Sequence, residues 1–208
     1  MKINTTEITA SMKAILEAES RAVSAIPVSE AYSRAVALII DRVHTRGGKL
    51  VTSGMGKAGQ IAMNIATTFS STGTPAVYLH PSEAQHGDLG LLRPDDVLLL
   101  ISNSGKTTEI LQLIELAHRL YEDLPVIVIT GNNTSPLSEL ADEVLYTGGA
   151  PEVCPLGLTP TTSTTMMTVI GDVLVVNTMK QIGFTREEYA KRHHGGYLGS
   201  AARNKSTK

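Results

Sequence analysis

Two segments, one rich in glycine and one rich in hydroxyl side chains, have the composition of phosphate-binding loops. Residues 54–59 read Gly-Met-Gly-Lys-Ala-Gly, and residues 102–109 read Ser-Asn-Ser-Gly-Lys-Thr-Thr-Glu. Each segment follows a short apolar run and precedes a stretch of helical length, so each places free backbone N–H groups at a helix start. Helix starts and hydroxyl groups both donate hydrogen bonds to phosphate oxygens. The second loop, with the hydroxyl groups of Ser102, Ser104 and Thr107, predicts a site for one phosphate monoester.

Both loops also resemble nucleotide-binding motifs, and each lacks a residue that those motifs need. The G-x-G-x-x-G pattern of residues 54–59 suggests a dinucleotide site, but Glu83 comes too late after the second apolar run to bind a ribose hydroxyl. The Gly-Lys-Thr of the second loop suggests a nucleotide P-loop, which requires glycine where this chain has Leu100. A tight turn, or a helix cap with nothing bound, is the alternative for each loop taken alone.

Titratable side chains in other glycine-flanked loops could carry out proton chemistry. His86 and His193 both stand shortly before glycines, and Glu109 lies in the first turn of the helix expected after the second loop. Aldose–ketose isomerisation uses such groups, because a base removes the proton next to the carbonyl and a donor stabilises the enediolate oxygen. A divalent metal on His86, Asp88 and His193 is the alternative, although no complete metal-ligand motif supports it.

A third polar segment, residues 154–165, contains two prolines and a run of threonines ahead of a long apolar stretch. It is interpreted either as a simple proline-started helix terminus or as a loop whose hydroxyl and N–H groups close over the sugar.

The elements that must position these loops alternate between two hydrophobic periods. Helical spacing over residues 5–46 predicts two long helices, and short apolar runs then recur at residues 50–52, 76–79, 97–101, 126–129 and 144–146. Helix-length segments between most of these runs indicate parallel strands joined by crossovers, so we expect a doubly wound α/β domain over residues 1–200 with its sheet core at residues 49–148. Residues 161–192 are expected to form closing helices, and residues 201–208 a flexible tail.

Composition excludes several classes of protein. The 208 residues carry a net charge of -2, which provides no basic field for nucleic acid or for an anionic membrane. Cys154 is the only cysteine, so no intrachain disulfide can form. The N-terminus lacks the apolar core of a signal peptide, and the chain has no apolar run of about 18 residues, so we expect a cytoplasmic protein without a membrane span.

Taken together and in order, the motifs resemble those of the D-arabinose 5-phosphate isomerases of the SIS (sugar isomerase) family. The segments that carry the resemblance are residues 54–57, 80–90, 102–105, 154–158 and 193–196. The resemblance implies a five-stranded parallel sheet between helices, and interconversion of D-ribulose 5-phosphate and D-arabinose 5-phosphate through an enediol. It also implies supply of the eight-carbon acid Kdo to lipopolysaccharide or capsule, no cofactor or metal, and a homotetramer with sites at subunit junctions.

The resemblance also implies roles for individual residues. Proton transfer at C1 and C2 is assigned to His193 or Glu109, assistance in ring opening to His86, and orientation of the substrate to Lys57, with the identity of the base left open. The set is as follows: catalytic Lys57, His86, Glu109 and His193; phosphate-binding Ser53, Ser102, Asn103, Ser104 and Thr107; and substrate-binding Gly54, Gly56, Thr161, Thr162, Ser163 and His194.

Three departures from the family pattern qualify that assignment. Lys106 replaces the usual glutamate of the phosphate loop, and His194 replaces the usual proline, which leaves open which histidine acts. The pair of CBS domains common in the family does not follow this domain, so we expect a stand-alone catalytic form. We therefore expect any feedback by a product such as CMP-Kdo to compete with substrate in the cleft, at Lys57 and the histidines. A sugar-phosphate-sensing module and an SIS isomerase of another sugar phosphate are the alternative functions.

Overall fold

Five short apolar segments form one parallel sheet in the computed structural model, which describes residues 3–203. The strands are β1 (Leu50–Gly54), β2 (Ala76–Tyr78), β3 (Val97–Ile101), β4 (Val126–Thr130) and β5 (Glu143–Tyr146). They lie in the order β2-β1-β3-β4-β5, and every neighbouring pair is parallel. All residues of β1, β3 and β4 are buried, as expected for central strands covered on both faces. The predicted doubly wound α/β fold is therefore confirmed.

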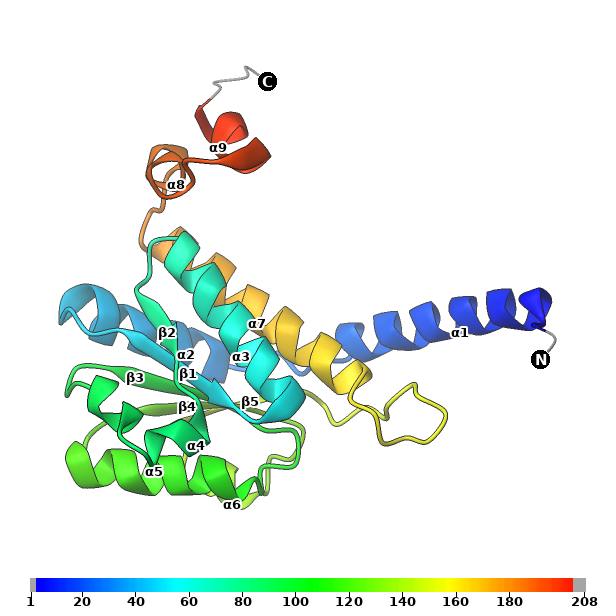
Figure 1. Ribbon diagram of the computed structural model, residues 1–208, viewed down its shortest axis with the longest axis horizontal. Coiled ribbons are helices and arrows are strands. Elements are labelled where there is room, and N and C mark those ends of the chain that lie inside the picture. Colours follow the sequence, from blue (N-terminus) through cyan, green and yellow to red (C-terminus); the bar gives the residue numbers. More distant parts are fainter. Residues whose placement is uncertain (1–2, 204–208) are drawn as a thin grey trace.

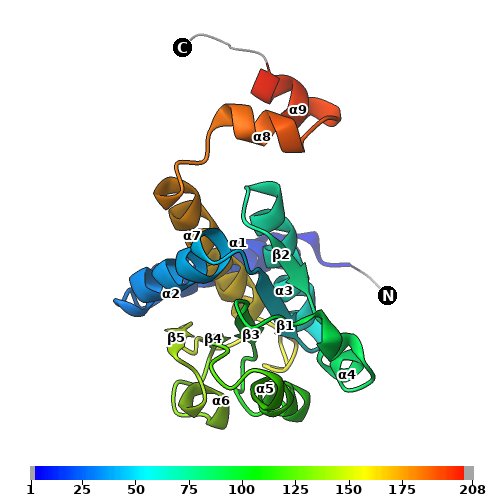
Figure 2. The same ribbon diagram turned by 90° about the vertical axis from the view of Figure 1, so that its left-hand side faces the viewer.

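Helices cover both faces of this sheet (Figures 1 and 2). One face carries α2 (Ala31–Ile39), which continues as a π-helical turn η1 (Ile40–Thr45), together with α3 (Gly56–Ser71) and α7 (Thr162–Gln181). The other carries α4 (Pro81–Ala84), the 3₁₀ turn η2 (Asp88–Leu91), α5 (Thr108–Leu120) and α6 (Pro136–Glu139). The spacing of the buried residues of α5, at Ile110, Leu113, Ile114 and Ala117, explains why it packs along one side.

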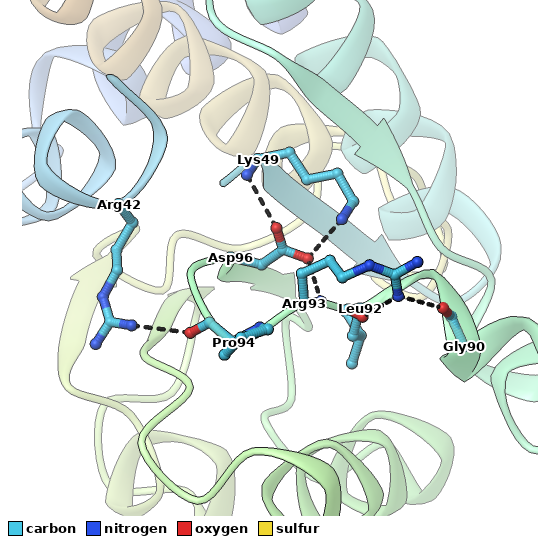
Figure 3. Close-up of polar contacts among 7 residues, drawn as sticks. All are labelled: Arg42, Lys49, Gly90, Leu92, Arg93, Pro94 and Asp96. Atoms are coloured by element: carbon cyan, nitrogen blue, oxygen red, sulfur yellow. Dashed lines mark hydrogen bonds and ion pairs between the residues drawn. The ribbon is translucent and has the colours of Figure 1, made fainter. Parts of the chain in front are cut away.

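A buried carboxylate ties together the amino ends of β1 and β3 (Figure 3). Asp96 has no exposed surface and accepts hydrogen bonds from the backbone N–H groups of Lys49 and Arg93, at 2.9 Å and 2.8 Å. The Lys49 ammonium lies 2.6 Å from the same carboxylate. Nearby, the Arg42 guanidinium donates to the backbone carbonyl of Pro94 at 3.1 Å. This network fixes the end of the sheet that faces away from the predicted phosphate loops.

Elements at the two ends of the chain project from this body (Figure 1). Helix α1 (Thr5–Ser24) begins at Asn4, whose side chain accepts from the Glu7 N–H, and extends outward as an arm. Helices α8 (Arg186–Arg192) and α9 (Gly196–Arg203) stand together away from the sheet. The expected flexible tail from residue 201 is wrong at its start, since residues 201–203 close α9; residues 204–208 lie outside the described residues.

Candidate active site

A pocket of about 410 Å³ lies at the carboxyl ends of β1 and β3. The chain passes from β1 to β2 on one side and returns to place β3 on the other, so these neighbours mark the point where the strand order reverses. Ligands of open α/β sheets bind at such a switch point. The loops after β1 and β3 form two walls, and the segment before α7 with the first turn of that helix forms a third. The lining residues used below are Lys57, Ser102, Asn103, Ser104, Thr107, Glu152 and Ser163.

The phosphate-binding loop after β3 is folded by its own hydroxyl groups. Ser102, which is almost fully buried, shares a hydrogen bond of 2.8 Å between its Oγ and Thr107 Oγ1. Gly105 donates its N–H to Ser102 Oγ at 3.2 Å and has a φ of +64°, a conformation that glycine adopts readily. A Cβ at Gly105 would also lie 1.9 Å from Ser135 Oγ. Both the backbone conformation and the lack of space therefore exclude a side chain at this position.

The loop after β4 holds three consecutive carbonyl groups of the phosphate-binding loop. The Gly131 N–H donates to the carbonyl of Asn103 at 3.1 Å, and Asn132 Nδ2 donates to that of Ser104 at 3.2 Å. The Leu137 N–H donates to the Gly105 carbonyl at 3.1 Å. Because residues that follow β4 donate hydrogen bonds to these three carbonyls, the conformation of the phosphate-binding loop is set before any ligand binds.

Two helix N-termini point their positive ends at this pocket. Helix α3 starts at Gly56 and α5 starts at Thr108, and neither start has a side-chain hydrogen bond from its N-cap residue. The first N–H groups of both helices are therefore available to an anion. Exposed Lys57, in the first turn of α3, adds a positive charge, and no ion pair to it is found among residues 3–203. The pocket thus suits a phosphate group.

Glu152 occupies the third helix N-terminus, that of α7. Its Oε2 accepts hydrogen bonds from Thr161 N–H at 2.7 Å, Thr161 Oγ1 at 2.9 Å and Ser163 N–H at 3.3 Å. Partial burial would raise the pKa of Glu152, but the Ser163 hydroxyl, together with these hydrogen bonds, outweighs burial and lowers it below its ordinary value of 4.5. A charged carboxylate therefore faces the same pocket as the phosphate loop.

The SIS domain model matches residues 45–177, which contain the whole sheet and this pocket. The chain belongs to the SIS domain family.

Similar proteins of this family include enzymes and solved structures. The arabinose 5-phosphate isomerase KdsD of Escherichia coli (strain K12) is 51% identical over 152 residues, which are 73% of this chain and 46% of that protein. The chain therefore spans about half the length of the curated relatives it matches. A protein of Bacteroides fragilis NCTC 9343, described as a phosphosugar isomerase involved in capsule formation, is 65% identical with a TM-score of 0.90, covering 91% of this chain and 99% of that one. A protein of E. coli CFT073, solved in complex with arabinose 5-phosphate, is 34% identical with a TM-score of 0.82, covering 92% and 100%.

The SIS pocket contains most of the predicted phosphate-binding residues. Ser102, Asn103, Ser104 and Thr107 all line it. The prediction that Ser53 binds phosphate is wrong. Ser53 has no exposed surface, and its hydroxyl donates to the Leu79 carbonyl at 2.6 Å, so it joins β1 to the end of β2 instead of facing a ligand.

The predicted substrate-binding residues divide between lining and support. Ser163 lines the pocket, whereas Thr161 is held by Glu152 and Thr162 donates to Glu19 Oε1 of α1 at 3.0 Å. Gly54 and Gly56 flank the turn into α3; a Cβ on Gly54 would lie 2.8 Å from the Ala58 backbone, so its role is close packing.

His86 and Glu109 lie near each other but outside the pocket of this chain. His86 is exposed in the turn after α4, and its neighbour Gln85 donates to Gln112 Oε1 of α5 at 3.1 Å. Glu109 lies one helical turn before Gln112, on the same side of α5. Neither of these two predicted catalytic residues lines the pocket that contains Lys57.

His193 and His194 lie at the opposite end of the sheet. His193 ends α8, where its ring stacks on Tyr189 at 3.7 Å and its Nδ1 lies 3.0 Å from the Tyr189 carbonyl. A Cβ on Gly73, in the turn that leads into β2, would lie 3.8 Å from the guanidinium carbon of Arg192. Helix α8 thus sits by the amino ends of the strands. A single chain therefore does not bring the four predicted catalytic residues together.

Glu152 and Asn132 are site residues that sequence reasoning missed. Neither belongs to a recognisable local motif: Glu152 is a single carboxylate nine residues before Thr161, and Asn132 lies in an ordinary Gly-Asn-Asn-Thr turn. A search for an anion to cap the start of α7 could have pointed to Glu152, since carboxylates favour helix N-termini.

Cys154 lies in the segment that borders the pocket. The N–H groups of Thr159 and Leu158 donate to its Sγ at 3.1 Å and 3.3 Å, and these bonds, led by that from Thr159, lower the pKa of the thiol to about 7. A substantial thiolate fraction at neutral pH follows.

Residues 3–203 contain no group of three or more His, Cys, Asp or Glu side chains placed to hold a metal ion. Within the same part of the chain, no helix combines the length and apolar character needed to cross a membrane.

Proposed function

We propose that this SIS domain is an aldose–ketose isomerase that interconverts D-ribulose 5-phosphate and D-arabinose 5-phosphate, and that it supplies Kdo to lipopolysaccharide or capsule. The observation that carries the proposal is a single-phosphate cradle at the switch point with a cation and a carboxylate beside it. Support for the substrate comes from the KdsD relatives and from the complex of the E. coli CFT073 protein with arabinose 5-phosphate.

The phosphate would serve as the handle that orients the sugar. The hydroxyls of Ser104 and Thr107 and the first N–H groups of α5 are the donors offered to its oxygens. Each charge-assisted hydrogen bond of this kind contributes about 1.5–3 kcal/mol. Binding energy from this non-reacting group would position C1 and C2 of the sugar for proton transfer.

Glu152 and Lys57 are proposed to act at the carbon end of the sugar. A base removes a proton from C1 of the ketose, and negative charge develops on O2 of the resulting enediolate. A proton then moves from O1 to O2, the carbonyl re-forms at C1, and the proton taken from C1 is returned to C2 to give the aldose. The Glu152 carboxylate can accept such a proton, or a hydrogen bond from a substrate hydroxyl, and the Lys57 ammonium can stabilise the oxyanion.

The remaining catalytic residues are proposed to come from other chains of a tetramer. His193 lies beyond the amino ends of the strands of its own sheet, so it would have to join the pocket of a neighbouring chain. His86, in the turn after α4, and Glu109, in the first turn of α5, could act on either side of such a junction. His193 or Glu109 is the alternative to Glu152 as the base that shuttles the proton, and His86 would assist ring opening.

A panel of sugar phosphates tests this proposal. The protein, treated with chelator and without nicotinamide, should convert D-ribulose 5-phosphate to D-arabinose 5-phosphate and leave hexose and heptose phosphates unchanged. An apoprotein that is inactive until metal is restored would refute the metal-free part, and turnover of a different sugar would refute the substrate.

The position of His193 also favours a second candidate, a sugar-phosphate-binding module without catalysis. A single chain provides the phosphate cradle but not the histidines. Calorimetric binding of arabinose 5-phosphate with no turnover under any condition would select this candidate.

Competition by a product is a further part of the proposal. The carboxylate of CMP-Kdo could occupy the site beside Lys57, so inhibition should be competitive with sugar phosphate. A thermal-shift titration showing that both ligands bind at once would place the effector elsewhere.

A further inference from the structure

The imidazole of His193 is held against the last turn of α8. Its ring stacks on the Tyr189 ring, with the ring centres 3.7 Å apart and the two planes 9° from parallel. Its Nδ1 lies 3.0 Å from the Tyr189 backbone carbonyl, which also accepts the His193 backbone N–H at 3.1 Å. A carbonyl oxygen can only accept, so Nδ1 carries the proton of the neutral ring. Nε2 is therefore the nitrogen that has the lone pair.

The two adjacent histidines differ in how their rings are held. Within residues 3–203, no hydrogen bond to His193 Nε2 is found, so this nitrogen remains available while Nδ1 is fixed. The His194 ring is exposed, and the described part of the chain offers it neither a stacking partner nor a hydrogen bond. An imidazole without such contacts can carry its proton on either nitrogen. Only His193 is thus fixed in both orientation and tautomer.

A chain of aromatic contacts connects His193 to the body of the domain. Tyr189 packs edge-to-face on Phe184, with the ring centres 6.4 Å apart and an angle of 73° between the planes. Phe184 lies against Gly73, in the turn between α3 and β2, since a Cβ there would lie 2.7 Å from Phe184 Cε2. The Arg192 guanidinium covers the Phe184 ring at 5.4 Å. Tyr189 is therefore the residue through which the domain fixes the position of the His193 ring.

The backbone of the histidine pair is held from α9. Arg203 donates hydrogen bonds to the carbonyls of His193 and His194, at 3.2 Å and 3.4 Å. The backbone of Gly199 lies against the same His193 carbonyl, since a Cβ there would be 2.1 Å from its oxygen. Both the ring and the backbone of His193 are thus held in place by groups of its own chain.

We propose that Tyr189 is a positioning residue for the isomerase, which holds His193 with its proton on Nδ1 so that Nε2 accepts a proton from the sugar. This inference rests on the proposed function, in which His193 joins the pocket of a neighbouring chain. It assigns the role to His193 and not to His194, because a general base must be oriented and unprotonated at the reacting nitrogen. When Nε2 takes the proton, the ring becomes an imidazolium whose Nδ1–H keeps its hydrogen bond to the Tyr189 carbonyl. The same proton leaves from Nε2 as the product forms.

Magic-angle-spinning NMR of the full chain, labelled with ¹⁵N in its histidine rings, tests the tautomer. The signals that disappear in His193→Gln are those of His193. At a pH where the ring is neutral, the wild type should carry this proton on Nδ1, whereas His194 should show a mixture of tautomers. Tyr189→Phe keeps the stacked ring and should keep the His193 signature, and Tyr189→Leu should lose it. Tyr197→Leu is the matched control at a tyrosine that is 84% exposed, and it should leave the signature unchanged.

Turnover of D-ribulose 5-phosphate gives a second readout. Tyr189→Leu should lower kcat at least about tenfold and change KM less than about twofold, because it misplaces the base and leaves the phosphate-binding loop intact. Tyr189→Phe should retain the wild-type kcat, and His194→Gln should lower kcat less than His193→Gln.

Three results would overturn the proposal: a proton on Nε2 of His193 in the neutral wild type, wild-type kcat in Tyr189→Leu, or a fall in kcat while the tautomer signature persists. The first of these needs no variant to fold. An active enzyme with the wrong tautomer would refute only this inference, whereas a wild type without isomerase activity would refute the proposed function as well.

Discussion

Two substitutions of Glu152 can distinguish its structural role, as the carboxylate that caps α7, from its proposed chemical role in the pocket. Oε2 accepts three hydrogen bonds, from the Thr161 N–H, the Thr161 hydroxyl and the Ser163 N–H. Glu152→Gln can place its amide oxygen at the Oε2 position, keep these three donors satisfied, and replace only Oε1. Glu152→Ala removes both. The two variants should therefore differ in stability and agree in loss of activity.

The expected magnitudes follow from the cap geometry. Loss of an N-cap acceptor costs about 0.5–2 kcal/mol, and loss of an anion at a helix N-terminus about 0.3–1 kcal/mol. Glu152→Ala should thus destabilise the fold by about 2 kcal/mol, a fall in Tm of about 4–8 °C for a domain of this size. Glu152→Gln loses only the charge and should fall by less than about 4 °C. General acid–base catalysis contributes about 10²–10⁴-fold, so both variants should lose at least about 100-fold in kcat.

The pH dependence of stability provides a further check on Glu152. Because the folded-state pKa lies below 4.5, the carboxylate contributes stability that is present above pH 4.5 and is lost as the pH falls below it. The difference in Tm between wild type and Glu152→Ala should shrink accordingly on acidification. A Glu152→Gln variant with wild-type turnover would refute the chemical role, and a Glu152→Ala variant with wild-type Tm would refute the cap.

Three other perturbations test separate parts of the structure. Asp96→Ala leaves the Lys49 ammonium and two backbone N–H groups unpaired, so chemical denaturation should show a loss of about 3–5 kcal/mol, while Asp95→Ala serves as control. Asn132→Ala removes the hydrogen bond to the Ser104 carbonyl and should raise KM with little change in kcat. An unchanged KM would contradict the role of Asn132 in holding the phosphate-binding loop. Alkylation of Cys154 by iodoacetamide should show a midpoint near pH 7, and a midpoint near 9 would contradict the hydrogen bonds to its sulfur.

The sheet and its switch-point site could be predicted because both leave local traces in the sequence. Buried parallel strands such as Val97–Ile101 are continuous apolar runs, and a phosphate loop of hydroxyls and glycine is contiguous in the chain. The same locality explains why Ser102 to Thr107 were predicted together and found together. Ser53 was misassigned because its motif is shared with ligand-binding turns, whereas its hydroxyl faces the neighbouring strand.

Features that depend on distant contacts could not be predicted. Glu152 meets Thr161 only after the segment between them has folded back, and Asn132 meets Ser104 across two strands. The remoteness of His193 follows from the direction in which the chain leaves α7, which no residue pattern encodes. The apolar residues Ile8, Met12 and Ile15 of α1 have ordinary helical spacing, so their exposure becomes evident only when the arm is seen beside the sheet.

Proton NMR of D-ribulose 5-phosphate in D₂O, with the chelator-treated protein, tests the proposed isomerisation most directly. An enediol intermediate predicts D-arabinose 5-phosphate as the product, with solvent deuterium at C2, and no product with Glu152→Gln. If the sugar phosphate binds but stays unchanged, or if the product is an epimer other than arabinose 5-phosphate, the assignment of this site is contradicted.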